Sequence, residues 1–137
     1  MVPSSFQFTN PVLLKLDFQV NEDFSSSDEL SLPIQFQVQK TQNDPAENTA
    51  TVKLFVTVGE KNSQMPYYID AIMCANFKWE PEKYDPKNLE NLLQKNAPAL
   101  LLSYIRPIIA NITNVSPYTV TNLPFFDFTK KPVKKSL

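Results

Sequence analysis

Apolar and polar residues alternate with a period of two in four separate segments of the chain. These segments are residues 12–20, 30–39, 51–58 and 67–79. In the third segment the apolar positions are Val52, Leu54, Val56 and Val58. Such alternation predicts strands with one buried and one wetter face, which is typical of an antiparallel sheet. Pro33 lacks an N–H group, so we expect an edge or a bulge in the second strand.

A helical pattern replaces the alternation after Trp79. Asp85 followed by Pro86 predicts a helix N-cap with proline at the first helical position. A second start at Ala97-Pro98 predicts a longer helix that runs to about Val115. Four strands followed by a helix indicate an α+β domain, with a four-stranded antiparallel sheet and a long helix on one of its faces.

The longer helix is apolar over an unusually wide arc. Its main stripe consists of Leu101, Tyr104, Ile105, Ile108, Ile112 and Val115. Leu102 and Ile109 widen this stripe, although a helix that covers one sheet needs an apolar arc of only about 100°. We therefore expect the helix to be buried on two sides, by its own sheet and by a second chain. Pro107 lies inside the helix, where it removes one backbone hydrogen bond and is expected to bend the axis.

Composition excludes several classes of function. The 137 residues suit a single domain, which we place at residues 1–129, followed by a basic disordered tail at residues 130–137. The tail holds four lysines, which leaves nine basic and fourteen acidic residues in the domain, a net charge of −5. This balance disfavours nucleic-acid binding. The chain has no His, one Gly and one Cys, so we expect no enzyme, no metal, no cofactor and no disulfide.

The chain carries no pattern typical of export or membrane insertion. Its first residues, Met-Val-Pro-Ser-Ser, lack the basic stretch and apolar run of a signal peptide. Its longest apolar runs are far too short to span a bilayer. We therefore expect a cytoplasmic protein with no stable insertion into a membrane.

Four motifs together resemble the protein-export chaperone SecB family. Residues 97–106 read Ala-Pro-Ala-Leu-Leu-Leu-Ser-Tyr-Ile-Arg, and residues 122–128 read Asn-Leu-Pro-Phe-Phe-Asp-Phe. Upstream, Val-Thr-Val-Gly-Glu at residues 56–60 and Ile-Asp-Ala-Ile-Met-Cys-Ala-Asn-Phe at residues 69–77 are similar to the sheet hairpin of that family. The resemblance covers roughly residues 12–128. The C-terminal helix found in many members is replaced here by Lys-Lys-Pro-Val-Lys-Lys.

The resemblance implies a function that the periodicity does not give. SecB-like proteins are ATP-independent holdases that keep unfolded preproteins competent for translocation and pass them to the motor protein SecA. They assemble as homotetramers, as dimers of dimers with the helices between two sheets. The resemblance therefore implies that Leu101, Tyr104, Ile105, Ile108 and Ile112 form an oligomer interface. Two alternatives stay open, namely a SecB-like chaperone dedicated to one partner such as an antitoxin, and a small-molecule carrier that uses an aromatic pocket.

The resemblance also implies two binding surfaces. The expected client-binding groove for unfolded polypeptides consists of Phe77, Trp79, Tyr84, Tyr118, Phe125 and Phe126. Aromatic side chains offer large contact areas without demanding a particular client sequence, although the same residues could instead pack in the core. The expected docking surface for SecA consists of Asp17, Glu22, Val58 and Glu60. The three acids could equally be ordinary solvated carboxylates.

Overall fold

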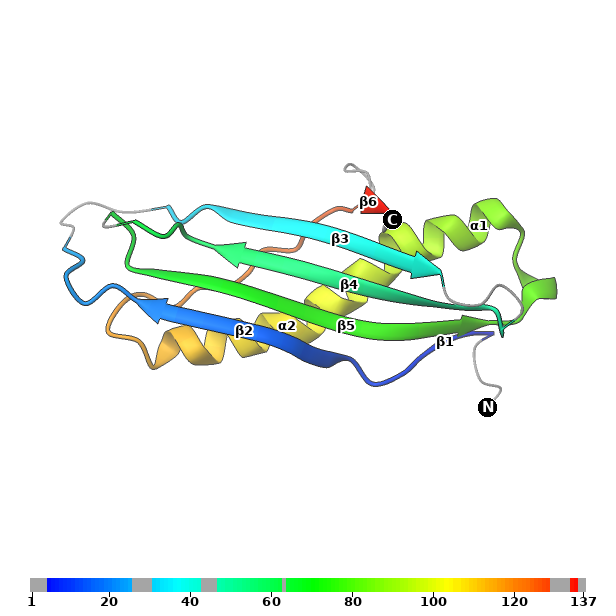
Figure 1. The fold of residues 1–137 in the computed structure, drawn as a ribbon, viewed down its shortest axis with the longest axis horizontal. Helices are drawn as coiled ribbons and strands as arrows, with labels where there is room; N and C mark the ends of the chain where they lie inside the picture. The colour runs from blue at the N-terminus through cyan, green and yellow to red at the C-terminus, as the bar shows by residue number, and fades with distance from the viewer. Residues whose placement is uncertain (1–4, 26–30, 43–46, 63, 129–133, 136–137) are drawn as a thin grey trace.

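The computed structural model describes residues 5–25, 31–42, 47–62, 64–128 and 134–135. Its strands are β1 (Phe6–Phe8), β2 (Val12–Val20), β3 (Ile34–Gln42), β4 (Thr49–Val58), β5 (Tyr67–Trp79) and β6 (Lys134–Lys135). Its helices are the short 3₁₀ turn η2 (Pro81–Lys83), α1 (Pro86–Asn91), the π-helical turn η3 (Leu92–Asn96) and α2 (Ala97–Asn114). Figure 1 shows α2 crossing one face of the sheet on a diagonal.

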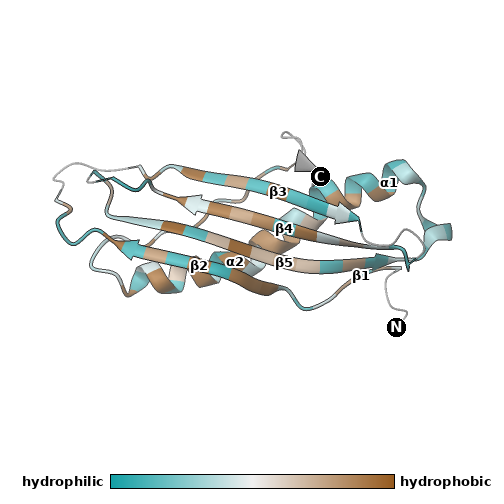
Figure 2. Ribbon diagram, viewed as in Figure 1, coloured by the Kyte–Doolittle hydropathy of each residue, from teal (hydrophilic) through white to brown (hydrophobic). Residues whose placement is uncertain are grey.

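The sheet runs in the order β1–β5–β4–β3–β6, and β2 pairs with β5 on the same side as β1. All pairings are antiparallel except that of β6 with β3. The four long strands match the four alternating segments of the sequence, and the bands of hydropathy along them are visible in Figure 2. Every second residue of β4 is buried, as the alternation predicts. The predicted α+β class, an antiparallel sheet with a long helix on one face, is confirmed.

β3 begins at Ile34, directly after Pro33, whereas the sequence predicts a strand from residue 30. Residues 26–30 lie outside the described part of the chain. The carbonyl oxygen of Pro33 accepts a hydrogen bond from the Gly59 N–H at 2.8 Å. Because Pro33 precedes the ladder, its missing N–H costs the sheet no hydrogen bond.

A β-bulge changes the faces of β2. The register shifts between Leu13 and Lys15, so Val12 pairs with Cys74 and Leu13 pairs with Met73. The strict alternation expected over residues 12–20, which would place Val12, Leu14 and Leu16 on one buried face, is therefore wrong at Val12 and Leu14. The extra residue places Leu13 on the helix-covered face, because residues that pair directly across two strands lie on the same side of the sheet.

The helices begin where the sequence predicts. The Asp85 side chain caps α1 by accepting a hydrogen bond from the Asn88 N–H at 2.7 Å, and Pro86 occupies the first turn. The π-helical turn η3, which the periodicity does not predict, then joins α1 to α2. Pro107 lies on the exposed side of α2, where the helix continues through it.

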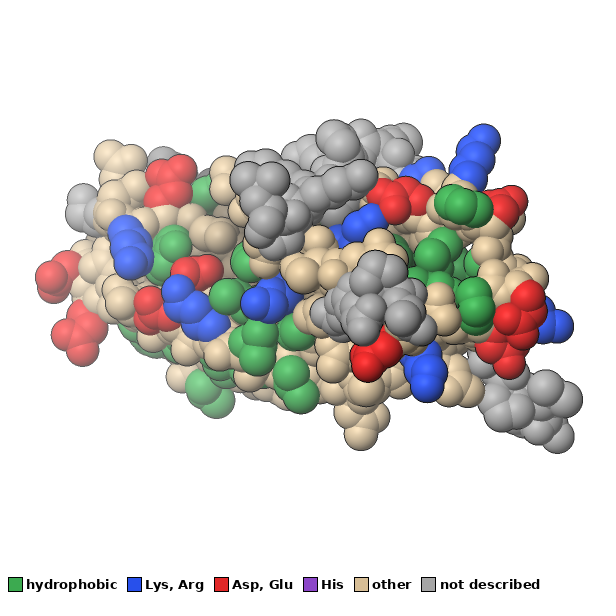
Figure 3. Space-filling model, turned by 45° about the vertical axis from the view of Figure 1, so that its right-hand side comes forward, with side chains coloured by type: hydrophobic (Ala, Val, Ile, Leu, Met, Phe, Trp, Pro, Cys, Tyr) green, Lys and Arg blue, Asp and Glu red, His purple; other side chains and the backbone are tan. Residues whose placement is uncertain are grey.

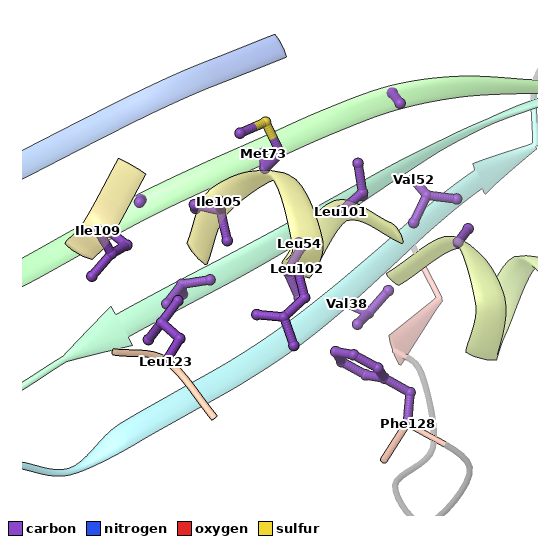
Figure 4. Packing of buried hydrophobic residues seen from close by; sticks show 14 of the residues in the cluster. Val38, Val52, Leu54, Met73, Leu101, Leu102, Ile105, Ile109, Leu123 and Phe128 are labelled. Atoms are coloured by element: carbon purple, nitrogen blue, oxygen red, sulfur yellow. The ribbon is translucent and has the colours of Figure 1, made fainter. Parts of the chain in front are cut away.

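The core lies between α2 and the two central strands β4 and β5. On α2, Leu101, Ile105 and Ile109 are fully buried and point toward the sheet, where Leu54 and Met73 lie (Figure 4). After α2 the chain returns along the β3 side of the helix and buries Leu123 and Phe128 in the same cluster. The predicted disordered tail falls largely outside the described residues, although Lys134–Lys135 form β6 beside β3.

Candidate functional site: apolar surfaces at both edges of the sheet

Six large apolar side chains remain exposed along the β1–β2 edge of the sheet and on the neighbouring side of α2. We call this surface the β2 strip, and its members are Phe8, Val12, Leu13, Leu14, Leu16 and Tyr104. In Figure 3 apolar side chains gather along the lower margin of the molecule, on the side where Figure 1 places β2. An exposed apolar patch of this kind usually marks contact with another polypeptide.

The β2 strip continues from the sheet onto the helix. Within the described residues, β2 pairs with β5 on one side and with no strand on the other. Leu16 pairs with Ala71 and so lies on the helix-covered face, but it keeps 37% of its surface exposed. The Phe8 and Tyr104 rings lie 6.5 Å apart between centroids and connect the edge to α2. The strip therefore offers an incoming chain both backbone groups and apolar side chains.

The predicted oligomer-interface helix needs a correction. Leu101 and Ile105 have no exposed surface in the single chain, because they face its own sheet. Tyr104 remains 42% exposed, and Ile108 and Ile112 are half-buried. Only these three residues of the predicted five have surface left for a second chain.

The predicted client-binding aromatics divide among three places instead of lining one groove, since Phe77 and Tyr84 both contact the ring of Phe6. Phe77 and Trp79 are buried in the core. Tyr84 is half-buried beside Phe6, with ring centroids 6.1 Å apart, and its hydroxyl is hydrogen bonded to that of Ser5 at 2.7 Å. Tyr118 lies at the opposite end of the sheet, where its hydroxyl donates to the Asn21 carbonyl at 2.6 Å. The remaining two aromatics, Phe125 and Phe126, lie on the β3 side.

We call Phe36, Phe125, Phe126 and Phe128 the β3-side aromatic cluster. The Phe36 ring lies 5.1 Å from that of Phe126 and 6.2 Å from that of Phe128. Phe128 is buried, Phe36 and Phe126 are half-buried, and Phe125 is 83% exposed. The sequence motif of residues 122–128 indicates three of the four residues, but it does not reveal Phe36, whose position depends on the pairing of β3 with β4.

Arg106 holds the exposed ring of Phe125 in place. Its guanidinium carbon lies 4.2 Å from the Phe125 ring centroid, and its Nε donates a hydrogen bond to the Leu123 carbonyl at 2.7 Å. A cation above an aromatic face is attracted by the ring quadrupole. One side chain of α2 therefore fixes the path of the segment that carries this cluster.

A buried polar network anchors the same segment at its other end. The Tyr67 hydroxyl donates to the Thr119 carbonyl at 2.8 Å and is hydrogen bonded to the Thr121 hydroxyl. The Thr121 N–H in turn donates to Thr113 Oγ1 at 2.9 Å. Burial raises the pKa of Tyr67, while the hydrogen bonds with Thr121 and Thr113 lower it in part. The network joins β5, the end of α2 and the returning segment.

Three of the four residues expected to dock SecA are accessible. Asp17 is half-buried, with its Oδ1 accepting from Gln19 Nε2 at 3.3 Å, and Glu22 and Glu60 are exposed. Val58 is fully buried and cannot contact a partner, because it faces the core from β4. This corrects the apolar member of the predicted surface.

A hollow of about 300 Å³ lies at the same end of the sheet, and its lining includes Gln19, Glu60, Lys61 and Tyr68. Lysines reduce the acidity of this region. Lys15 Nζ contacts Asp70 Oδ2 at 2.7 Å, and Asp70 raises the pKa of the Lys15 ammonium through this hydrogen bond and through its charge. The Lys61 ammonium lies 5.1 Å from the Tyr68 ring centroid.

Three further features of the described residues concern metal binding, thiol reactivity and membrane spanning. No three His, Cys, Asp or Glu residues among them gather into a group that could hold a metal ion. Cys74 is buried, and burial raises the pKa of its thiol. In this part of the chain no helix has the length and hydropathy needed to cross a membrane.

Comparison with known proteins now identifies the family. The model of the family described as "Preprotein translocase subunit SecB" matches residues 16–131. The chain belongs to the SecB family. Members of this family are chaperones, and the SecB match covers β2 from Leu16 onward, β3 to β5, all of α2 and the whole β3-side aromatic cluster.

Two solved structures resemble this SecB-family chain. A SecB-like chaperone of Mycobacterium tuberculosis, in complex with a ChAD peptide from the HigA1 antitoxin, aligns with a TM-score of 0.73 at 17% identity, over 89% of this chain and 91% of that one. A Streptococcus agalactiae protein of unknown function aligns with a TM-score of 0.45 at 11% identity, over 88% of this chain and 97% of that one. No curated protein sequence matches the chain. The first of these structures supports a SecB-like fold.

Proposed function

We propose that this chain is an ATP-independent holdase that binds non-native polypeptides and keeps preproteins competent for export from the cytoplasm. The observation that carries the proposal is the β3-side aromatic cluster, in which Phe125 is 83% exposed against Arg106 and the next residue, half-buried Phe126, contacts the ring of Phe36. Such a surface binds apolar segments through contact area and needs no fixed client sequence. The cluster replaces the single six-residue groove expected from the sequence.

The β2 strip forms the proposed interface between two copies of this chain. Two copies related by a two-fold axis can pair their β2 edges in antiparallel register and continue the sheet. Tyr104, Ile108 and Ile112 of the neighbouring α2 faces would then be covered as well. A tetramer built from such dimers offers several weak client sites, and later contacts of one client become effectively intramolecular.

The export role depends on the residues expected to dock SecA. Asp17 and Glu60 remain accessible for a basic partner such as the SecA tail, but Val58 is buried and Lys15 and Lys61 offset the acids. A dedicated partner is the second candidate, because the M. tuberculosis neighbour was solved with an antitoxin peptide. Neither the hollow beside Glu60 nor a second one beside Arg106 in the described structure fits a small-molecule carrier with an aromatic pocket, because none of the predicted aromatics lines them.

The test is the refolding of a slow-folding model protein without nucleotide, followed by light scattering, in the presence of wild-type chain or one of two variants. Phe125→Ala removes an exposed aromatic of the cluster. Val115→Ala is the matched control, because Val115 is 82% exposed at the far end of α2. Burial of one Phe side chain is worth about 1.5–3 kcal/mol, so we expect Phe125→Ala to weaken client binding by roughly tenfold.

The wild-type chain and Val115→Ala should suppress aggregation at a fixed ratio to the oligomer, and Phe125→Ala should require a higher concentration. Equal suppression by all three proteins would mean that the exposed ring of Phe125 does not contribute to client binding. Absence of suppression by a stable wild-type oligomer would contradict the general holdase and favour the dedicated partner. Equal binding of folded and unfolded forms of one client would contradict both.

A further inference from the structure

We infer that an extended client segment binds by adding as a strand to the free edge of β3, and that the chain's own β6 occupies part of this edge in the absence of client. The inference rests on the proposed function and specifies its binding mode and its regulation. The occupant is a non-native polypeptide in extended conformation, whose backbone supplies the hydrogen bonds of the new ladder.

The first observation is the pairing of β3. One of its sides pairs with β4 along the full strand, from Ile34 opposite Val58 to Gln42 opposite Ala50. On its other side, the strands of the described region contribute only β6, which pairs in parallel with Gln39 and Lys40. Residues 34–38 therefore have no strand partner on that side within the described structure, so their outward-facing N–H and C=O groups can receive a strand.

The second observation is that residues 34–39 of this edge carry no charged side chain. Proteins usually protect an edge strand with lysine, proline or a bulge. The only charged residue of β3 is Lys40, which is buried and contacts Glu90 Oε2 at 2.6 Å. The outward side chains Gln35 and Gln37 are neutral amides, which can both donate and accept hydrogen bonds and so tolerate many client sequences. β6 is thus the covering that the structure places on this edge.

The third observation is that the edge continues directly into the β3-side aromatic cluster. Phe36 lies in the middle of the unpaired stretch, and its ring contacts those of Phe126 and Phe128. A client strand laid along β3 would direct every second side chain toward these rings. Backbone pairing and aromatic contact would then reinforce each other at one site.

The two-residue length of β6 makes it replaceable. A typical strand has five or six residues, and a parallel ladder is slightly less stable per residue than an antiparallel one. A client that pairs with five or more residues of β3 would form a longer ladder than the β6 it displaces. β6 therefore acts as an internal competitor, which lowers the affinity for short or weakly apolar segments and leaves long unfolded ones able to bind.

The experiment compares full-length wild type with two double variants. Lys134→Pro/Lys135→Pro removes the backbone N–H groups of β6, and Lys134→Gln/Lys135→Gln removes the same charges while keeping the N–H groups. The probe is fluorescently labelled, reduced and carboxymethylated α-lactalbumin, a permanently unfolded polypeptide, titrated by anisotropy. Hydrogen exchange of the β3 amides is measured with and without the probe.

We expect the proline variant to bind the probe about three- to tenfold more tightly than wild type, the gain from losing one or two competing hydrogen bonds. The glutamine variant should bind like wild type. Without probe, amides at residues 39–40 should exchange faster in the proline variant. With probe, exchange should slow along residues 34–39 in all three proteins.

Three results would overturn the inference. If the probe binds all three proteins equally, β6 is no competitor, although the holdase itself stands. If the probe slows exchange along β2 and leaves β3 unchanged, the client binds at the other edge. If no protein binds the probe, the proposed function fails and the inference fails with it, whereas binding by the proline variant alone would support both.

Discussion

Tyr67 shows how one side chain can set the position of a surface far from it in the sequence. Its hydroxyl reaches the returning segment through Thr119 and Thr121, and that segment then carries Phe125 and Phe126 to the β3 side. The hydroxyl is buried in this network. Loss of a buried hydrogen-bonding group leaves its partners unsatisfied, which costs more than the bond itself is worth.

Tyr67→Phe should lower the free energy of unfolding by about 1–2 kcal/mol at neutral pH. The free energy of unfolding of this variant should also fall less steeply than that of wild type as the pH rises above about 10. The raised pKa of Tyr67 means that the unfolded chain loses this proton first, so the contribution of Tyr67 is complete below about pH 10 and is lost as the pH rises toward the folded-state pKa. Urea unfolding from pH 7 to pH 11 measures both effects.

Tyr68→Phe is the control for this prediction, because Tyr68 is half-buried on the opposite face of β5 and is not a member of the network formed by Tyr67, Thr113 and Thr121. It should leave both the neutral stability and the alkaline slope near those of wild type. The same alkaline slope in wild type and Tyr67→Phe would show that other groups cause it.

Among the elements, the turn between β4 and β5 depends most strictly on one residue. Gly59 has a φ of 76°, and a Cβ added there would lie 2.4 Å from the carbonyl oxygen of Tyr67. That atom belongs to the backbone of β5, so the contact cannot be relieved by a side-chain rotation. Gly59→Ala should therefore destabilise the protein by about 2–4 kcal/mol, from backbone strain and from the clash together.

Thermal unfolding followed by circular dichroism measures this loss, with Asn48→Gly as the matched control. Asn48, directly before β4, also has a positive φ, of 52°. Glycine adopts this conformation without strain, so the control should be neutral or stabilised by up to about 1 kcal/mol. A Gly59→Ala protein as stable as wild type would mean that the turn can rearrange at little cost.

The elements also show what local sequence can and cannot predict. The alternation within β4 and β5 and the Asp85-Pro86 cap depend on neighbouring residues alone, and the structure confirms them. The bulge near Leu14 is different, because it depends on which residues of β5 oppose β2. β1 and η3 are short, and each depends on a segment distant in the sequence, since β1 pairs with β5 and η3 contacts β3.

In the candidate site, too, local sequence predicts some features, whereas others depend on tertiary packing. The motif at residues 122–128 lies in the segment that carries Phe125 and Phe126, and the wide apolar arc of the long helix includes Tyr104, which stays 42% exposed. That these surfaces bind a client and a second chain stays a prediction. Neither pattern could distinguish Phe77 and Trp79, which are buried, from Phe125, which is exposed. That distinction depends on how the returning segment packs against α2 and β3.

At the scale of the whole molecule, the two edges of the sheet have separate proposed partners, a second copy at β2 and a client at β3. Leu16→Lys tests the first assignment. Leu16 faces the α2 side of the β2 strip and is 37% exposed, so the single chain can direct a lysine there into solvent. In a dimer that pairs the β2 edges, the ammonium would be buried without a partner, which costs several kcal/mol and should weaken association at least about a hundredfold.

Light scattering and sedimentation should find wild type as a tetramer and Leu16→Lys as a smaller species with an unchanged circular dichroism spectrum. Gln35→Lys is the control, because Gln35 is an exposed residue on the opposite edge strand, β3. It adds the same charge and should keep the wild-type mass. If Leu16→Lys also keeps that mass, the copies meet elsewhere, and the β2 strip becomes a candidate surface for the client. If Gln35→Lys is the variant that dissociates, the two edges exchange roles, and the copies of the chain pair through β3.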